Sequence, residues 1–179
     1  MPIVAADYVA VPRDTPMPDA DRYLFCQGVL IGKRVGDQSD EERALAWRVN
    51  YAQIRDECDR LIAGNDQARI CVIGSEAGYV GSYDAIYAQT KAALHQYVRD
   101  KRLRTPEQQL ICIAPSLIED AGMCSRRVDM ENVERKRQSH PKGRLLTAAE
   151  VARLVYFVLY EDRGYLSGVV LRMNGGAHI

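Results

Sequence analysis

Four apolar runs of strand length alternate with helix-forming segments along the chain, and this alternation restricts the fold more than any other feature. The runs are Tyr23–Ile31, Ala68–Ser75, Gln109–Ala114 and, with its turn, Gly168–Gly176. Apolar runs without polar alternation are typical of strands buried on both faces. Strands that alternate with helices form a mostly parallel sheet, with helices on both faces and right-handed crossovers. We therefore predict a single α/β domain over residues 1–179.

Two capping boxes mark where helices begin. Ser39 and Glu42 open a helix that keeps apolar spacing to about Ala63, and Thr147 with Glu150 opens another. In such boxes the hydroxyl accepts a backbone N–H while the glutamate returns to the cap residue. The first helix is expected to stop at Gly64-Asn65.

Two segments give weaker patterns. Residues 1–24 begin with a possible strand, Ile3–Ala6, and continue as an extended, proline-containing connection. From Ser116 to Arg144 the sequence is charged and loses its period, which predicts a solvated, mobile segment. Its position after a strand end is also where a lid would lie. The cations of such a lid would favour an acidic or thioester-linked anionic substrate.

Composition excludes several classes of function. The 24 basic and 24 acidic residues give no net charge that would attract nucleic acid or an anionic membrane. No apolar run approaches the ~18 residues of a membrane span, so the cytoplasm is the expected compartment. Among five cysteines, Cys71 and Cys112 lie in apolar strands, as expected of reduced, packed thiols. The three histidines are scattered, and we expect no metal site.

The segment Ser75–Lys91 carries the chemistry. Ser75 follows an apolar strand, and Tyr87 and Lys91 stand four residues apart at the start of a helix. This spacing places the phenol and the ammonium on one helical face, where the positive charge is expected to lower the tyrosine pKa toward the range of an acid or base. Ser75 would hydrogen-bond a substrate oxygen beside that phenol. Alternatively, the tyrosine and lysine serve packing alone.

The order of these residues resembles the short-chain dehydrogenase/reductase family from about Tyr23 to the end. The matching features are Asn50 in an upstream helix, Ser-x-Ala-Gly at Ser75, Tyr87-x-x-x-Lys91 and the strand ending Ala114-Pro115. The resemblance implies a truncated, three-layer Rossmann-like sheet and the catalytic set Asn50, Ser75, Tyr87 and Lys91. Tyr87 would be the acid/base, Ser75 would orient the substrate, and Asn50 would hold a proton-relay water.

The resemblance also implies NAD or NADP as cofactor. The implied cofactor-binding residues are Gly28, Lys91, Pro115, Ser116 and Ile118. Three departures from the family affect these contacts, and one of them is Asp120, which stands where a cofactor-contacting threonine is expected. Phe25-Cys26-Gln27-Gly28 stands where the family has Asn-Asn-Ala-Gly, and Ala114-Pro115-Ser116 stands where Pro-Gly is usual.

The family normally begins with two strand-helix units that carry a glycine-rich dinucleotide turn. Only 24 residues precede Phe25 here, whereas one βαβ unit takes roughly 30 or more. Gly28, Gly32 and Gly36 could form a phosphate loop, but too few residues separate Gly28 from Asn50 for the elements that would have to follow. We expect a shortened family member whose cofactor binding is impaired or is completed by another subunit.

Three functions remain open from the sequence. The first is an NAD(P)-dependent oxidoreductase that acts on a small carbonyl or alcohol substrate. The second is an isomerase or lyase that uses Ser75, Tyr87 and Lys91 without hydride transfer. The third is a non-catalytic binding or oligomerisation module. A sheet shortened at its first strands has an exposed edge, so we expect a homodimer or homotetramer.

Overall fold

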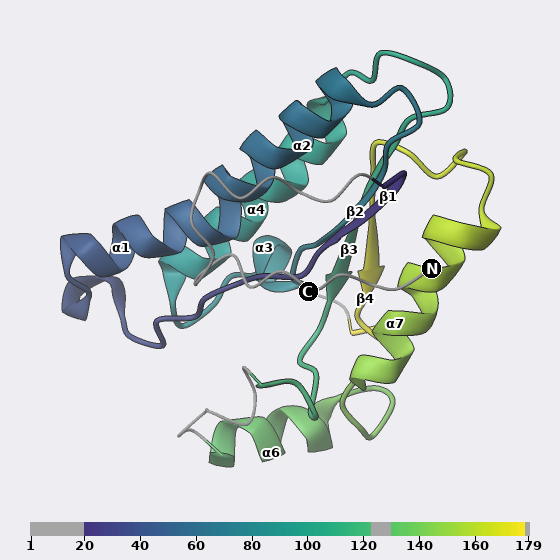
Figure 1. The fold of residues 1–179 in the computed structure, drawn as a ribbon. Coiled ribbons are helices and arrows are strands. Elements are labelled where there is room, and N and C mark those ends of the chain that lie inside the picture. The colour runs from purple at the N-terminus through teal and green to yellow at the C-terminus, as the bar shows by residue number, and fades with distance from the viewer. Residues whose placement is uncertain (1–19, 123–129, 178–179) are drawn as a thin grey trace.

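The core of the fold is a four-stranded parallel sheet. The structure is a computed structural model that describes residues 20–122 and 130–177. The strand order is β1-β2-β3-β4 (Figure 1). The strands are β1 Arg22–Phe25, β2 Arg69–Ile73, β3 Gln109–Pro115 and β4 Val169–Met173. The predicted α/β fold with a parallel sheet is confirmed. The predicted strand Ile3–Ala6 lies outside the described residues.

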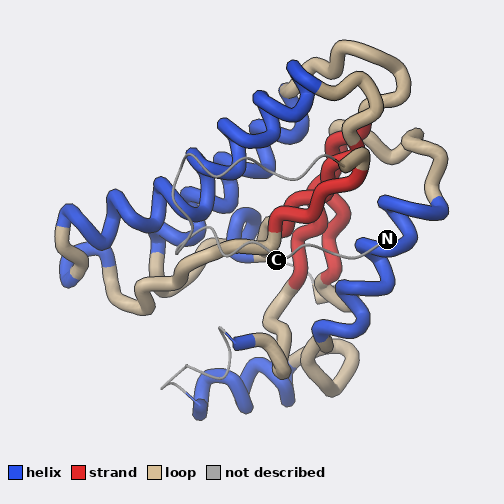
Figure 2. The backbone as a smooth tube through the Cα atoms, in the orientation of Figure 1, coloured by secondary structure: helices blue, strands red, loops and turns tan. Residues whose placement is uncertain are grey.

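Helices cover both faces of the sheet (Figure 2). The helices of the described residues are α1 Asp40–Trp47, α2 Gln53–Gly64, α3 Ala77–Val80, α4 Ala85–Asp100, α6 Met130–Ser139 and α7 Ala148–Tyr156, of which α2, α4 and α7 pack on the sheet. Three shorter helical turns are Val35–Asp37, Arg48–Ala52 and Phe157–Glu161. Within the described ranges, no helix combines the length and the apolar character needed to cross a bilayer.

Alternate residues of the strands pack into two separate apolar clusters. Ile70 and Val72 of β2 face Ile54 and Leu94, which belong to α2 and α4. Cys71, between them in sequence, faces α7 on the opposite side. Figure 1 shows α2 and α4 on one side of the sheet and α7 on the other. A strand buried on both faces must be apolar at every position, which explains the unbroken runs in the sequence.

The first strand is shorter than the sequence predicted. The apolar run Tyr23–Ile31 was expected to be one strand, but β1 ends at Phe25. The backbone N–H of Val29 donates to the Asn50 side chain, and those of Ile31 and Gly32 donate to Asp84. These backbone N–H groups donate to side chains and not to the backbone of a neighbouring strand. The segment therefore leaves the sheet after Phe25.

Both capping boxes are confirmed. The Ser39 and Thr147 hydroxyls accept the backbone N–H groups of Glu42 and Glu150. The side chain of each glutamate in turn accepts the backbone N–H of the cap residue. The helix that starts after Ser39 continues to Gly64 as predicted. It contains a π-helical turn at Arg48–Ala52, which the sequence did not predict. Such turns often occur at functional sites, and this one holds Asn50.

The charged segment Ser116–Arg144 was predicted to be solvated, mobile and without a periodic pattern, but its second half contains a helix. Helix α6 occupies Met130–Ser139 and packs Val133 against Leu145 and Leu117. Arg137 also pairs with Glu119 at 3.4 Å. Glutamate, arginine, lysine and glutamine are good helix formers, so one apolar anchor is enough to hold this helix on the protein.

Candidate active site

Three of the four predicted catalytic residues meet at the carboxyl edge of the sheet. Ser75 lies two residues beyond the end of β2, and Tyr87 and Lys91 lie in the first two turns of α4. The Ser75 hydroxyl lies close enough to the Tyr87 phenol to lower its pKa. The Lys91 Nζ atom lies 5.9 Å from the centre of the Tyr87 ring. The predicted Ser/Tyr/Lys group is therefore assembled in space.

Asn50 reaches this group indirectly. Its Oδ1 accepts the Val29 N–H at 2.8 Å, and its Nδ2 donates to the Val29 carbonyl at 2.9 Å. The same Nδ2 donates to the Thr90 hydroxyl at 3.2 Å, and that hydroxyl donates to the Tyr87 carbonyl at 2.8 Å. Asn50 thus holds the segment after β1 against α4. Its role in a proton relay stays a prediction.

The turn that carries Ser75 packs tightly against α4. The Ser75 hydroxyl accepts the Ala77 N–H at 3.2 Å, and the Ser75 N–H donates to His95 Nε2 at 3.3 Å. A Cβ atom at Gly74 or at Gly78 would lie closer than 3.0 Å to the His95 ring. Both glycines are therefore required by the imidazole, which fills the space that their side chains would take.

The pKa of Tyr87 moves in the direction opposite to the prediction. Burial raises the pKa of the Tyr87 phenol, and the Asp84 carboxylate raises it further, while the hydrogen bond from Ser75 lowers it. The Lys91 ammonium lies 5.9 Å from the centre of the ring, and its charge does not outweigh the loss of water around the phenol. The spacing of residues 87 and 91 was predicted correctly, but the sequence could not show the burial.

Lys91 is a buried cation. Its side chain is 2% exposed, and its Nζ donates to the Ile73 carbonyl at 2.9 Å. Burial lowers the pKa of the Lys91 amine to about 8, against smaller opposing effects of Cys112 and Cys26. The lysine therefore loses its charge within a pH range where enzymes are commonly assayed.

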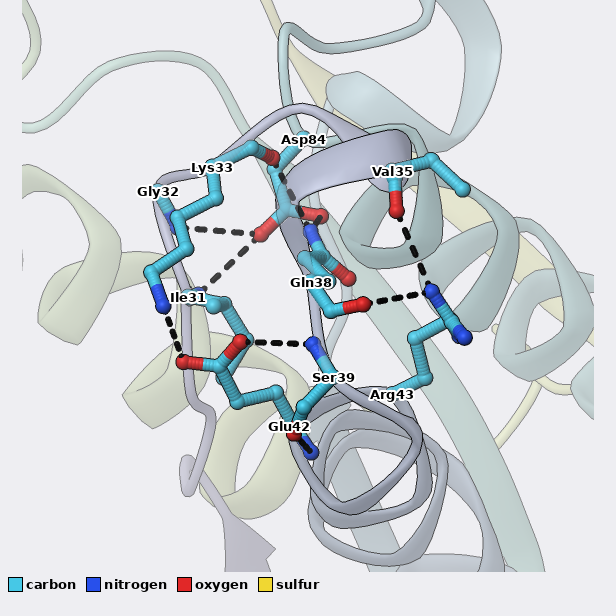
Figure 3. A network of polar contacts seen from close by, with 9 residues as sticks. All are labelled: Ile31, Gly32, Lys33, Val35, Gln38, Ser39, Glu42, Arg43 and Asp84. Carbon is cyan, nitrogen blue, oxygen red and sulfur yellow. Dashed lines mark hydrogen bonds and ion pairs between the residues drawn. The ribbon is translucent and has the colours of Figure 1, made fainter.

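Asp84 is a site-forming residue that the sequence did not reveal. This buried carboxylate accepts the Tyr87 N–H and caps α4. It also accepts the N–H groups of Ile31 and Gly32 at 3.0 and 3.1 Å and the Gln38 amide at 2.9 Å. Figure 3 shows the carboxylate between the loop and Gln38. Asp84 thus joins the segment after β1 to the helix turn that carries Tyr87. The sequence did contain a sign of its capping role, because aspartate is a preferred N-cap residue and Asp84 directly precedes the helix.

The predicted cofactor residues lie in two loops at the same edge. Gly28 is exposed in the segment after β1, and Pro115 is buried at the end of β3. Ser116 lines a cavity of about 190 Å³ together with Met173 and Lys142. Ile118 packs into the apolar cluster beneath α7. The structure thus gives Gly28 and Ser116 access to a ligand and buries Pro115. Their roles toward a cofactor stay predictions.

Comparisons with known proteins identify the family. A family model described as Enoyl-(Acyl carrier protein) reductase matches residues 26–178. A crystal structure of a short-chain dehydrogenase/reductase from Brucella melitensis, described as a glucose/ribitol dehydrogenase, superposes with a TM-score of 0.79 at 22% identity, over 89% of this chain and 65% of that one. This chain belongs to the short-chain dehydrogenase/reductase family.

Curated relatives are longer than this member of the family. The 3-oxoacyl-(acyl-carrier-protein) reductase MabA of Mycobacterium tuberculosis is 32% identical over 80% of this chain and 58% of its own length. A tropinone reductase homolog of Arabidopsis thaliana is 28% identical over 83% of this chain and 59% of its own length. An uncharacterized oxidoreductase of Bacillus subtilis is 30% identical over 64% of this chain and 48% of its own length. The chain therefore spans about half the length of the relatives it matches.

Replacing Gly74 with alanine tests the packing of the turn that carries Ser75. The new Cβ would collide with His95 and the Cys112 sulfur, so Gly74→Ala is expected to lower the free energy of unfolding by about 1–3 kcal/mol in chemical denaturation. Gly64→Ala is the control, because Gly64 ends α2 and a Cβ added there would meet open space. The control should be neutral or slightly stabilising. Equal losses in both variants would contradict the packing described.

Proposed function

We propose that the chain is an oxidoreductase that interconverts a carbonyl and an alcohol, with Tyr87 as acid/base and NAD or NADP as hydride carrier. The observation that carries this proposal is the proximity of the Ser75 hydroxyl to the Tyr87 phenol, beside the buried Lys91 ammonium. A hydroxyl and a phenol at one point can together bind a single carbonyl oxygen. Membership of the family supports the proposal.

Each residue has a separate task in the proposed reaction. Ser75 donates a hydrogen bond to the substrate oxygen, and Tyr87 transfers its phenolic proton to the same oxygen as the carbonyl is reduced. The Lys91 charge then stabilises the phenolate that remains. Asn50 keeps the segment after β1 in place, through its paired bonds to Val29.

The raised pKa of Tyr87 favours reduction over oxidation. A phenol whose pKa lies above its ordinary value near 10 stays protonated at neutral pH, so the resting chain holds a proton donor and not a base. Proton donation is what carbonyl reduction requires. We therefore propose that reduction is the direction for which this site is prepared, with a 3-oxoacyl thioester as the first substrate class to test because one relative is named a 3-oxoacyl reductase.

The residues at the strand ends suit the nicotinamide end of a dinucleotide. Gln27, beside Gly28, has an Nε2 atom that is buried without a hydrogen-bond partner among the described residues. A buried donor without an acceptor is unfavourable, and a ligand oxygen would satisfy it. We propose that Gly28, Lys91, Pro115, Ser116 and Ile118 hold the cofactor, with Lys91 donating to ribose hydroxyls. The cofactor would supply the hydride.

Cofactor titration and substitution of Tyr87 test the proposal. We expect NADH or NADPH fluorescence to change on binding, and acetoacetyl-coenzyme A to be reduced by the wild-type chain. Tyr87→Phe should lower kcat at least about 100-fold, because the proton donor is lost. Tyr83→Phe is the matched control, since Tyr83 is 63% exposed and should keep full activity.

Two results would overturn the proposal. One is the absence of binding at millimolar NADH and NADPH. The other is a turnover that needs Tyr87 but is indifferent to nicotinamide, which would indicate an isomerase or lyase.

Lys91 should set the upper pH limit of reduction. Its amine is charged below its pKa of about 8 and neutral above it, whereas the Tyr87 phenol stays protonated across this range. The rate constant kcat/KM for reduction is therefore expected to be level below about pH 8 and to fall above it. Lys91→Arg keeps the charge at high pH, so its smaller residual activity should no longer fall there. A decline at the same pH in Lys91→Arg would contradict the assignment.

A further inference from the structure

His95 is a buried titratable residue that the proposed reaction does not use. Its side chain belongs to α4 and is 1% exposed. The ring lies against Gly74 and Gly78, and it packs on the Tyr79 ring with 4.9 Å between the ring centres. A polar ring in such a place must offset the loss of water with a hydrogen bond. Its partner is the backbone N–H of Ser75, at 3.3 Å from Nε2.

The partner fixes the chemical form of the ring. A backbone N–H can only donate, so Nε2 must carry its lone pair and cannot be protonated. The neutral form with its proton on Nδ1 is the one that makes this bond. An imidazolium, with protons on both nitrogens, would lose the bond and leave two donors facing each other.

The surroundings keep the ring neutral. Burial lowers the pKa of the His95 imidazole to about 4, and the cations Arg99, Lys91 and Arg172 act in the same direction. Glu76 opposes them, but it is paired with Arg172. These groups come from α4, from β4 and from the turn after β2. The neighbouring Cys112 of β3 is a buried thiol whose pKa burial raises to about 12, so it adds no charge.

Three side chains from one face of α4, on successive turns of the helix, lie against the end of β2 and the serine that follows it. Tyr87, Lys91 and His95 follow one another at intervals of four residues and therefore share that face. Lys91 donates to the Ile73 carbonyl, His95 accepts the Ser75 N–H, and the Tyr87 phenol lies beside the Ser75 hydroxyl. His95 thus holds the backbone of the same serine whose hydroxyl lies beside the phenol. A change at His95 therefore moves the hydroxyl relative to the phenol.

We propose that His95 is a positioning residue, whose neutral imidazole accepts the Ser75 N–H and thereby sets the Ser75 hydroxyl against the Tyr87 phenol. The inference deepens the proposed function and rests on it for its catalytic consequence. The contact itself is a property of the folded chain and is independent of any substrate. The hydrogen bond and its effect on catalysis are therefore tested in separate experiments.

The contact is tested by NMR on the ¹⁵N-labelled full chain. We expect the His95 ring to carry its proton on Nδ1 at pH 7, and the Ser75 amide proton to exchange slowly. In His95→Leu, which keeps an apolar side chain but removes the acceptor, Ser75 exchange should accelerate about tenfold. His95→Gln offers an oxygen acceptor near the place of Nε2 and should retain most of the protection. A wild-type ring protonated on Nε2 overturns the inference without the need for any variant.

The reaction is tested with acetoacetyl-coenzyme A and NADPH on the same two variants, each confirmed to be folded by its cooperative thermal transition. We expect kcat to fall about tenfold in His95→Leu and to recover within about threefold in His95→Gln, with the KM for NADPH unchanged. Equal kcat values in the two variants overturn the positioning role. A wild-type chain without turnover overturns the proposed function alone, and the His95 contact is then decided by the ring tautomer and Ser75 exchange.

Discussion

The buried hydrogen bond from the Lys91 ammonium to the Ile73 carbonyl is the interaction on which the site depends. It joins the second turn of α4 to the last residue of β2, at a distance of 2.9 Å. A cation with 2% exposure is unfavourable unless it is bonded, so this contact fixes how far along the strand the helix must lie. With that position fixed, Tyr87 lies one helical turn before Lys91 and His95 one turn after it, and both side chains lie near Ser75.

The loop after β1 is fixed by the same helix from its other side. Asp84 bonds Ile31 and Gly32 at the start of α4, and Asn50 bonds Val29 from the neighbouring π-helical turn. Both are buried side chains that replace the sheet ladder beyond Phe25. The carboxyl edge of the sheet is therefore built from side chain to backbone bonds that converge on α4. Gly28 stays exposed in this loop.

Local patterns in the sequence predicted the elements, and contacts between distant segments decided the rest. The capping boxes at Ser39 and Thr147 were predictable because each involves groups three residues apart. The end of β1 was not, because it depends on Asp84, more than 50 residues away along the chain. Helix α6 depends on a single apolar anchor, Val133, which a periodic pattern cannot reveal.

The same division applies to the site. Ser75, Tyr87 and Lys91 were found from their order and spacing, since four residues along a helix fix a common face. The direction of the Tyr87 pKa was missed because it depends on burial, and burial is a property of the packed molecule. His95 also lies on that face, four residues after Lys91, so the spacing could have indicated its position. Its bond to the Ser75 backbone could not be inferred from side-chain patterns.

The most direct measurement of the Ser75–Tyr87 contact is an NMR titration of the tyrosine ¹³Cζ resonances, with Tyr87 assigned by comparison with Tyr87→Phe. The account predicts that the phenol titrates above its ordinary pKa near 10, because burial dominates, and that Ser75→Ala raises this pKa further by removing a hydrogen bond to the phenolate. A Tyr87 phenol that titrates at or below its ordinary value, or that is unaffected by Ser75→Ala, would contradict it.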